Sequence, residues 1–304
     1  FYAPSWGRKG DLKDVECLLC HGGKVTREII DQAPNLKLIQ SEGVAFNRID
    51  LEAAKEKGIF VCNNKGCNAG AVAEQTVLLI LMLLRHALEG DEAVRAGRQM
   101  EMKERCMVEG ITELSACKVG LVGFGDIARA AAERLVPFGC ELYYYTKRRR
   151  LPEEEKKYHV TYLPLEELAE KSDIVSLHCA VTEETRNLVD AALLRRMKPT
   201  AYLINTARGD LLDNLAVRQA LIEGRLGGAG FDVLSPEPTP ADHPLVPAGH
   251  PLTALPPEVQ RKVVLAPHLG GITEASFRRA HAHMWRNVEH LAAGERPDNI
   301  VNGL

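Results

Sequence analysis

Three side chains that could bind an anion and transfer a proton follow one another along this chain: Arg208, Glu237 and His268. Each comes soon after an apolar run typical of a β-strand. Because open α/β sheets bind ligands beyond the carboxyl ends of their parallel strands, we expect the three to lie at one sheet edge. Arginine grips a carboxylate through two hydrogen bonds, histidine transfers a proton, and glutamate orients that histidine and stabilises its charged form. A small 2-keto acid needs this set of groups to accept a hydride.

Taken singly, each of these residues has an ordinary structural explanation. Arg208 could form a surface ion pair, Glu237 could be a solvated loop carboxylate, and His268 could be a packed histidine. Their shared position after strands favours the catalytic interpretation. For His281 and His283 we favour a structural role, because residues two apart on a helix do not share a face that could hold a metal.

The middle of the chain alternates strand-like and helix-like runs, which predicts a Rossmann-type, doubly wound parallel sheet with right-handed crossovers. The expected strands are 118–124, 141–146, 174–179, 202–205, 230–234 and 263–266. The expected helices between them are 126–136, 165–171, 190–197 and 214–223.

A smaller α/β segment comes first, with expected strands at 15–20, 36–41 and 60–62. A helix over 71–88 should lead into the central domain, and a helix over 273–293 should return the chain to the first. We therefore expect two domains. One is a discontinuous, flavodoxin-like substrate domain made of residues 1–71 and 273–304, and the other is a dinucleotide-binding domain made of residues 72–272.

The formal net charge of −3 argues against nucleic acid or an anionic membrane as a partner. The longest apolar run, residues 77–84, is far shorter than a membrane span of about 20 residues. It predicts a helix buried in the core or at a subunit contact. The charged segment 89–115 is expected at the surface or against a partner subunit. Residues 235–257, with eight prolines, are expected to form an irregular loop.

The eight cysteines lie mostly inside apolar runs, which predicts reduced, buried thiols in a cytoplasmic protein. Cys17 and Cys20 have the spacing of a metal-binding pair, and Cys62 and Cys67 could supply a second pair. However, a strand over 15–20 would point the first two thiols to opposite faces, so we expect core thiols and no metal.

A glycine turn stands where the first central strand gives way to a helix. Its glycines are Gly123 and Gly125, and the helix opens with Asp126 and Ile127. This context predicts a dinucleotide-binding turn, because the glycines admit a pyrophosphate and the helix start offers unpaired N–H groups. The alternative is a turn that only packs the helix against the sheet.

The next strand ends at Thr146, about 20 residues beyond the glycines, where NAD-binding proteins usually carry an acid. The positions that follow are basic and include Lys147 and Arg148. A carboxylate would repel the 2′-phosphate of NADP, whereas these three side chains would bind it. We therefore expect NADP rather than NAD. The alternative is a solvated basic turn in a protein that uses NAD.

With these residues in place, the chain resembles the D-isomer-specific 2-hydroxyacid dehydrogenases over nearly its whole length. The matching stretches are 119–128, 172–178, 184–188, 197–199, 204–213, 230–238 and 266–271. In that family the Arg of an Asn-x-x-Arg-Gly run binds substrate, and a Glu before Pro pairs with a His before Gly-Gly. The resemblance therefore implies these roles for Arg208, Glu237 and His268.

The resemblance implies further contacts. Asp232 would contact the nicotinamide, and other cofactor contacts would come from Cys179, Ala180, Thr206, Ala207, Arg208, His268 and Gly270. Residues 41–50 resemble the family loop whose backbone N–H groups receive the substrate carboxylate, which points to Glu42, Gly43 and Val44.

The chain also departs from the family pattern. Gln75 stands where many relatives carry His, and Ala128 replaces a third glycine. The sequence begins at Phe1, close to the expected second strand of the first domain, so we expect the first βα unit of that domain to be missing.

The resemblance implies an NAD(P)-dependent oxidoreductase that interconverts a small 2-keto acid and its D-2-hydroxy acid. Because NADP points to reduction, we expect an NADPH-dependent reductase of glyoxylate or hydroxypyruvate, and family likeness implies a homodimer. The alternative is an NAD(P)-sensing corepressor or scaffold of the same fold with little turnover.

Overall fold

The computed structural model describes residues 11–20, 23–237, 252 and 255–304. The chain divides into two compact units: unit 1 is Phe1–Asn68 with Ile272–Leu304, and unit 2 is Ala69–Gly271. The unit boundaries lie within a few residues of the expected domain boundaries. Most of the expected proline-rich loop, residues 238–251 and 253–254, lies outside the described residues.

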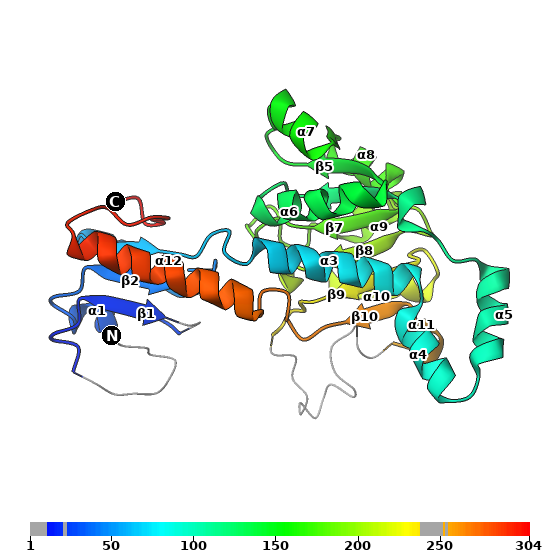
Figure 1. Ribbon diagram of the computed structural model, residues 1–304, viewed down its shortest axis with the longest axis horizontal. Helices are drawn as coiled ribbons and strands as arrows, with labels where there is room; N and C mark the ends of the chain where they lie inside the picture. The colour runs from blue at the N-terminus through cyan, green and yellow to red at the C-terminus, as the bar shows by residue number, and fades with distance from the viewer. Residues whose placement is uncertain (1–10, 21–22, 238–251, 253–254) are drawn as a thin grey trace. The chain divides into compact units, whose positions relative to one another are not determined.

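Unit 2 is built on a seven-stranded parallel sheet in the order β10-β9-β8-β7-β4-β5-β6 (Figure 1). Its strands are β4 (Lys118–Val122), β5 (Glu141–Tyr145), β6 (Val160–Tyr162), β7 (Ile174–Leu177), β8 (Tyr202–Asn205), β9 (Gly228–Phe231) and β10 (Val263–Leu265). Numbered within the unit, this is the 3-2-1-4-5-6 order of dinucleotide-binding folds with one strand added at the edge. The predicted Rossmann-type sheet is confirmed, and its order reverses between β4 and β7.

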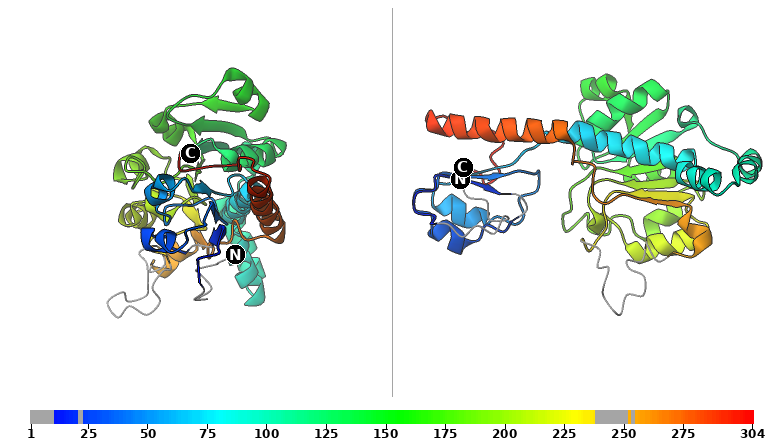
Figure 2. Two further views of the ribbon diagram at one scale, coloured as in Figure 1. Left: turned by 90° about the vertical axis from the view of Figure 1, so that its left-hand side faces the viewer. Right: turned by 60° about the horizontal axis from the view of Figure 1, so that its bottom comes forward.

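Helices cover both faces of this sheet (Figure 2). On one face, Val119 and Leu121 of β4 pack in a cluster with α3 (Ala69–Leu84) and α6 (Asp126–Leu135). On the other, Val122 belongs to a cluster with α8 (Leu165–Lys171), α9 (Ala191–Arg196) and α10 (Asn214–Ile222). Burial on both faces explains why these strands read as nearly continuous apolar runs.

Some boundaries differ from the sequence predictions. The helix expected over 71–88 ends at Leu84, because His86 adopts a left-handed conformation with φ +49° and a new helix begins. The strand expected over 230–234 is shifted to β9, Gly228–Phe231. The helices not predicted within unit 2 are α4 (Ala87–Arg95), α5 (Gln99–Glu109), α7 (Pro152–Tyr158) and α11 (Pro257–Gln260).

Unit 1 has a three-stranded parallel sheet in the order β1 (Cys17–Cys20), β2 (Leu38–Ser41), β3 (Phe60–Cys62). The short helices α1 (Arg27–Asp31) and α2 (Leu51–Glu56) contribute to the cluster on one face. The long helix α12 (Glu274–Ala292) packs on the other face, as Figure 2 shows. Thr273 caps α12 in a reciprocal arrangement with Ser276.

The cysteine thiols lie where the strand pattern predicts. Cys17 packs with Leu38 and Cys62 on one face of β1, whereas Cys20 belongs to the cluster on the other face. All eight cysteines are free, and burial raises the pKa of Cys20 to about 11 and that of Cys62 to about 12. No group of three or more potential metal ligands occurs among the described residues. Over the same residues, no single helix is long and apolar enough to cross a membrane; α3 and α4 meet that criterion only as a pair bent by 58°.

Candidate active site

The glycine turn after β4 has the geometry that a dinucleotide needs. Gly123 adopts φ +96°, and a Cβ there would lie 2.7 Å from the carbonyl carbon of His178, so only glycine fits this position. At Gly125, the residue before α6, nothing lies within 4 Å of the position a Cβ would take. Open space beside the N–H groups that begin at Asp126 and Ile127 suits a pyrophosphate, so these residues fit the cofactor.

The loop after β7 lies against this turn. Cys179 and Ala180 follow His178, whose backbone N–H donates to the carbonyl of Val122 over 2.7 Å. Burial lowers the pKa of His178 to about 4, and its Nε2 lies 2.9 Å from the hydroxyl of Ser176. A neutral imidazole therefore underlies the segment that carries two predicted cofactor contacts.

Two arginines after β5 stabilise their own loop through hydrogen bonds. Arg149 grips Glu155 through two hydrogen bonds of 2.8 Å, and the same carboxylate accepts from the hydroxyl of Tyr144 over 2.7 Å. The Arg150 guanidinium donates to the carbonyl of Phe124 inside the glycine turn over 3.1 Å. The basic run is therefore tied both to α7 and to the expected pyrophosphate site.

The side chains predicted to contact a 2′-phosphate differ in whether they already have hydrogen-bond or ion-pair partners. The Thr146 hydroxyl donates to the carbonyl of Arg148 over 2.7 Å, and Lys147 forms an ion pair with Glu184 from the loop after β7. Within the described residues, the exposed guanidinium of Arg148 forms no ion pair. Arg148 is thus the cation of this run that is available to an added phosphate.

Arg208 lies in a loop after β8 that is fixed from two sides. The buried side chain of Asn205 donates to the Arg208 carbonyl over 2.8 Å and accepts from the Ala207 N–H over 3.0 Å. A Cβ on Gly209 would overlap the backbone of Leu234, so the β8 and β9 loops pack directly against each other. The Arg208 side chain itself is exposed, and its guanidinium donates to the Ala207 carbonyl over 2.6 Å.

His268 and Glu237 form a pair on neighbouring loops. The His268 Nδ1 lies 2.7 Å from Glu237 Oε2, and both side chains are partly exposed. Because Nδ1 faces the carboxylate, Nε2 is the nitrogen left to face a ligand. Arg208, Glu237 and His268 follow β8, β9 and β10, which are adjacent in the sheet, so the structure brings all three to one edge.

Asp232 has a role that the sequence did not reveal. Its buried carboxylate accepts from the N–H of Leu269 over 2.9 Å and of Gly270 over 2.8 Å, while its carbonyl accepts from the His268 N–H over 2.8 Å. The Gln75 amide reaches the same carboxylate at 3.4 Å. Asp232 therefore holds the loop that carries His268. The apolar neighbours of Asp232 in the sequence predict that its carboxylate is buried. That pattern could have indicated its supporting role.

Thr206 lies inside unit 2. It is 6% exposed, and its hydroxyl lies 3.0 Å from that of Thr76 on α3. Its side chain joins α3 to the end of β8, so any contact with a cofactor would come from its backbone.

In unit 1, hydrogen bonds hold the backbone carbonyls of the loop after β2. The Glu42 carbonyl accepts from the Asn64 side chain over 2.7 Å, that of Gly43 from the Asn64 N–H over 3.0 Å, and that of Val44 from the Asn63 side chain over 2.8 Å. In the part of the chain that the structure describes, the N–H groups of Gly43 and Val44 have no acceptor. Free amides opposite held carbonyls are a geometry in which a loop can bind an anion, so residues 42–44 are referred to as the anion-binding loop.

Helix α12 braces this loop through two histidines. The His281 Nε2 lies 3.0 Å from Glu42 Oε1. The His283 Nδ1 lies 2.7 Å from Asn64 Oδ1, while its Nε2 lies 3.2 Å from the side-chain nitrogen of Asn299. Burial lowers the pKa of His283, which fits a neutral ring that donates from Nδ1. The structural role expected for these histidines therefore includes supporting the anion-binding loop.

The fold and these side chains define a class: a dinucleotide-binding α/β protein with an arginine and a histidine–glutamate pair at the sheet edge. Residues 77–270 match the model of the D-isomer specific 2-hydroxyacid dehydrogenase, NAD binding domain. The chain belongs to the D-isomer-specific 2-hydroxyacid dehydrogenases.

Named relatives agree with this assignment. The chain is 39% identical to a glyoxylate reductase of Thermofilum pendens over 293 residues, which are 96% of this chain and 83% of the relative. Among solved structures it is similar to the TT0316 protein of Thermus thermophilus, with a TM-score of 0.80, 33% identity, and coverage of 95% and 87%. It is also similar to a D-lactate dehydrogenase of Aquifex aeolicus complexed with NAD and lactic acid, with a TM-score of 0.79, 28% identity, and coverage of 96% and 88%.

The protein is therefore an enzyme, an oxidoreductase that uses a nicotinamide cofactor and acts on a small 2-keto or 2-hydroxy acid. The names of the relatives favour the enzyme over the alternative of a sensing or scaffold protein.

Proposed function

We propose that the protein is an NADPH-dependent reductase that converts a small 2-keto acid, with glyoxylate and hydroxypyruvate as the leading candidates, to the hydroxy acid. The observation that carries this proposal is the 2.7 Å pair of His268 and Glu237, on the loops after β10 and β9, at the same sheet edge as the Arg208 loop after β8. The glyoxylate reductase name of a relative at 39% identity supports the choice of substrate.

Each residue has a defined chemical task in this reaction. The bound nicotinamide cofactor supplies the hydride that adds to C2 of the keto acid. Arg208 binds the substrate and polarises its C2 carbonyl. His268 donates a proton from Nε2 to the carbonyl oxygen, and Glu237 stabilises the protonated imidazole through Nδ1. The free amides of Gly43 and Val44 bind the substrate carboxylate. Oxidation of the hydroxy acid reverses these roles.

The preference for NADP rests on the loop after β5. Thr146 replaces the acid that would repel a 2′-phosphate, and Arg148 is exposed with no ion pair among the described residues. A free guanidinium binds a phosphate through two parallel hydrogen bonds. Lys147 is a second cation within the same turn, and exchange of its exposed Glu184 partner for a phosphate costs little.

The proposal is tested by following the absorbance of NADPH or NADH with glyoxylate, hydroxypyruvate, pyruvate and a branched 2-keto acid. We expect fast oxidation of NADPH with glyoxylate or hydroxypyruvate and a lower kcat/KM with NADH. Arg148→Ala should raise the KM for NADPH about tenfold and leave that for NADH unchanged. Arg196→Ala, which breaks an exposed ion pair with Glu170 on α8, is the control. Equal use of both cofactors would refute the NADP preference, and binding without turnover would refute the activity.

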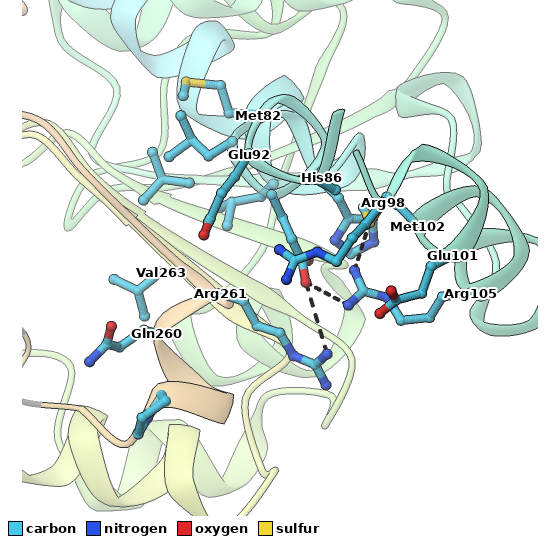
Figure 3. Close-up of a pocket in the computed structure, with 16 residues that line it drawn as sticks. Met82, His86, Glu92, Arg98, Glu101, Met102, Arg105, Gln260, Arg261 and Val263 are labelled. Carbon is cyan, nitrogen blue, oxygen red and sulfur yellow. Dashed lines mark hydrogen bonds and ion pairs between the residues drawn. The ribbon is translucent and has the colours of Figure 1, made fainter. Parts of the chain in front are cut away.

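We also propose that two copies of the chain form a homodimer through the arm made of α4 and α5. Helix α5 has no buried residue, and isolated helices of this length are marginal in water. Met107 and Val108 on it are 75% and 87% exposed. A cavity of about 540 Å³ lies beside this arm. Its lining includes the apolar Met82 and Val263 and charged side chains such as Arg98 and Arg105 (Figure 3).

A protruding helix with two exposed apolar side chains and a cavity lined by apolar and charged residues on one chain suit a two-fold contact, in which each copy offers both parts. An apolar centre within a charged rim is typical of such interfaces. Light scattering on the eluting protein tests this: Val108→Asp should give a monomer, whereas Leu215→Asp, at an exposed apolar residue of α10, should not change the mass. A monomeric wild-type protein, or a Val108→Asp dimer, would refute the proposal.

A further inference from the structure

The peptide unit that joins Phe124 to Gly125 lies in the middle of the glycine turn. In a trans peptide the C=O and N–H point in opposite directions, so the direction of the Phe124 carbonyl sets that of the Gly125 N–H. Within the described residues this N–H has no acceptor, and nothing lies within 4 Å of the position that a Gly125 Cβ would take. Because glycine backbone rotates easily, this open amide needs a restraint from elsewhere if it is to bind an anion.

Arg150 supplies that restraint. Its Nη2 donates to the Phe124 carbonyl over 3.1 Å, although 26 residues separate the two. This hydrogen bond holds the plane of the peptide and therefore directs the Gly125 N–H away from the guanidinium. Among the residues that the structure describes, Arg150 forms no ion pair. Its positive charge therefore remains beside the turn, where it favours an anion.

The strand before Arg150 holds the arginine in turn. The Arg150 backbone N–H donates to the Tyr144 hydroxyl over 2.8 Å, and that hydroxyl donates to Glu155 over 2.7 Å. The Tyr144 ring also packs against the Phe124 ring, with centroids 4.6 Å apart. Phe124 is therefore held at two points, its side chain by Tyr144 and its carbonyl by Arg150.

The burial of Arg150 favours a role in binding over a role in stability. Its Nε is buried and has no hydrogen-bond partner among the described residues. A buried donor without a partner opposes folding. The contact with the glycine turn is thus made in spite of a loss of stability, which is expected where a side chain serves a ligand site.

We propose that Arg150 is a positioning residue for the pyrophosphate of the cofactor: it orients the Phe124–Gly125 peptide so that the Gly125 N–H faces the pyrophosphate. NADPH and NADH share this pyrophosphate, so the inference goes beyond the proposed NADP preference and depends on neither that preference nor the keto acid. It predicts that loss of Arg150 weakens both cofactors by the same factor, whereas loss of Arg148 weakens NADPH alone.

Three substitutions of Arg150 separate this role from others. Arg150→Met keeps the length of the side chain but removes the donor, and Arg150→Gln is polar but two bonds shorter, so both should lose the contact. Arg150→Lys should retain it, because an ammonium can make a single hydrogen bond to a carbonyl. The matched control is Arg134→Met, because Arg134 Nη1 donates over 3.1 Å to the carbonyl of Ala130, which lies within α6 and outside the turn.

Calorimetry on the full chain without cofactor measures Kd values for four ligands. NADPH, NADH and ADP-ribose carry the pyrophosphate, whereas adenosine 2′-phosphate does not. We expect Arg150→Met and Arg150→Gln to raise the first three Kd values about tenfold each and to leave that for adenosine 2′-phosphate unchanged. Arg150→Lys should stay within about threefold of wild type, and Arg134→Met should match wild type.

Unchanged Kd values for NADH and ADP-ribose in Arg150→Met and Arg150→Gln would overturn the inference. A loss confined to NADPH would overturn it as well, since Arg150 would then contact the 2′-phosphate. An equal loss for adenosine 2′-phosphate would indicate general damage to the loop after β5, and an Arg150→Lys protein as weak as Arg150→Met would refute the single hydrogen bond. If wild type binds ADP-ribose but reduces no keto acid, only the proposed function is wrong, and the Kd values still decide the role of Arg150.

Discussion

His268 and Glu237 are joined by a 2.7 Å contact between Nδ1 and Oε2, although 31 residues separate them and each follows a different strand. The backbone of His268 adopts φ +58°, a conformation that a non-glycine residue keeps only when its surroundings impose it. Asp232 imposes it, through its carbonyl and both carboxylate oxygens. Asp232 and Glu237 therefore hold the backbone and Nδ1 of His268, which leaves Nε2 as the nitrogen that can donate a proton.

Glu237→Gln should lower kcat for keto-acid reduction about 10²-fold and leave the Kd for NADPH unchanged. The amide keeps the size of the side chain but no longer stabilises the charged imidazole. Steady-state kinetics with both substrates saturating measure the effect. Glu223→Gln, at an exposed acid after α10, is the control. A Glu237→Gln enzyme with the kcat of wild type would show that the pair has no part in proton transfer.

Arg208→Lys should raise the KM for the keto acid and lower kcat, together reducing kcat/KM by about 10²-fold or more. Lysine retains the charge but replaces a planar fork with a single point of contact. Arg186→Lys, at an exposed arginine paired with Asp210, is the matched control and should keep its activity. Full activity in Arg208→Lys would contradict a two-bond grip on the substrate.

Gly209→Ala should lower the free energy of unfolding by about 1–3 kcal/mol, because its Cβ would overlap the backbone of Leu234 and force the β8 and β9 loops apart. Gly90→Ala is the control: Gly90 lies within α4 with nothing within 4 Å of its Cβ position, so alanine there should stabilise the helix by up to about 1 kcal/mol. Urea unfolding measures both. Equal stabilities would contradict the close approach of the two loops.

His178 should make the stability depend on pH in acid. Burial lowers its pKa to about 4 from an ordinary value of 6.5, so between these values the unfolded chain binds a proton that the folded chain does not. The free energy of unfolding therefore falls as the pH is lowered from 6.5 toward 4, and His178 contributes no slope above pH 7. His178→Gln should reduce this slope, measured by urea unfolding at pH 7, 6 and 5. An unchanged slope would show that His178 titrates normally.

Much of the fold follows from sequence pattern. Buried parallel strands are short and apolar, so β4, β5, β7, β8 and β10 lie within the ranges expected, and α8 has the expected bounds. Strand β9 is shifted because Gly227 precedes it and Gly228 begins it, and glycines give no apolar signal. They are needed there because a Cβ would meet the carbonyls of Thr200 and Lys262.

The sequence pattern could not predict the arm made of α4 and α5 or the tertiary contacts of the site. Helices α4 and α5 carry almost no buried residues, so they lack the apolar periodicity on which such predictions depend. The pairing of Glu237 with His268 was expected from family likeness, and in the structure their Oε2 and Nδ1 atoms lie 2.7 Å apart. The roles of Asp232 and His281 as supports depend on contacts across long sequence separations, which no local pattern encodes.

The central claim, that His268 delivers the proton during reduction of a 2-keto acid, is tested most directly by comparing wild type and His268→Gln in one assay. NADPH oxidation is followed with glyoxylate at saturation, and NADPH binding is measured by its fluorescence. We predict turnover by wild type, and a His268→Gln enzyme that binds NADPH equally well but turns over about 10³-fold more slowly. Equal turnover by both enzymes would contradict the account.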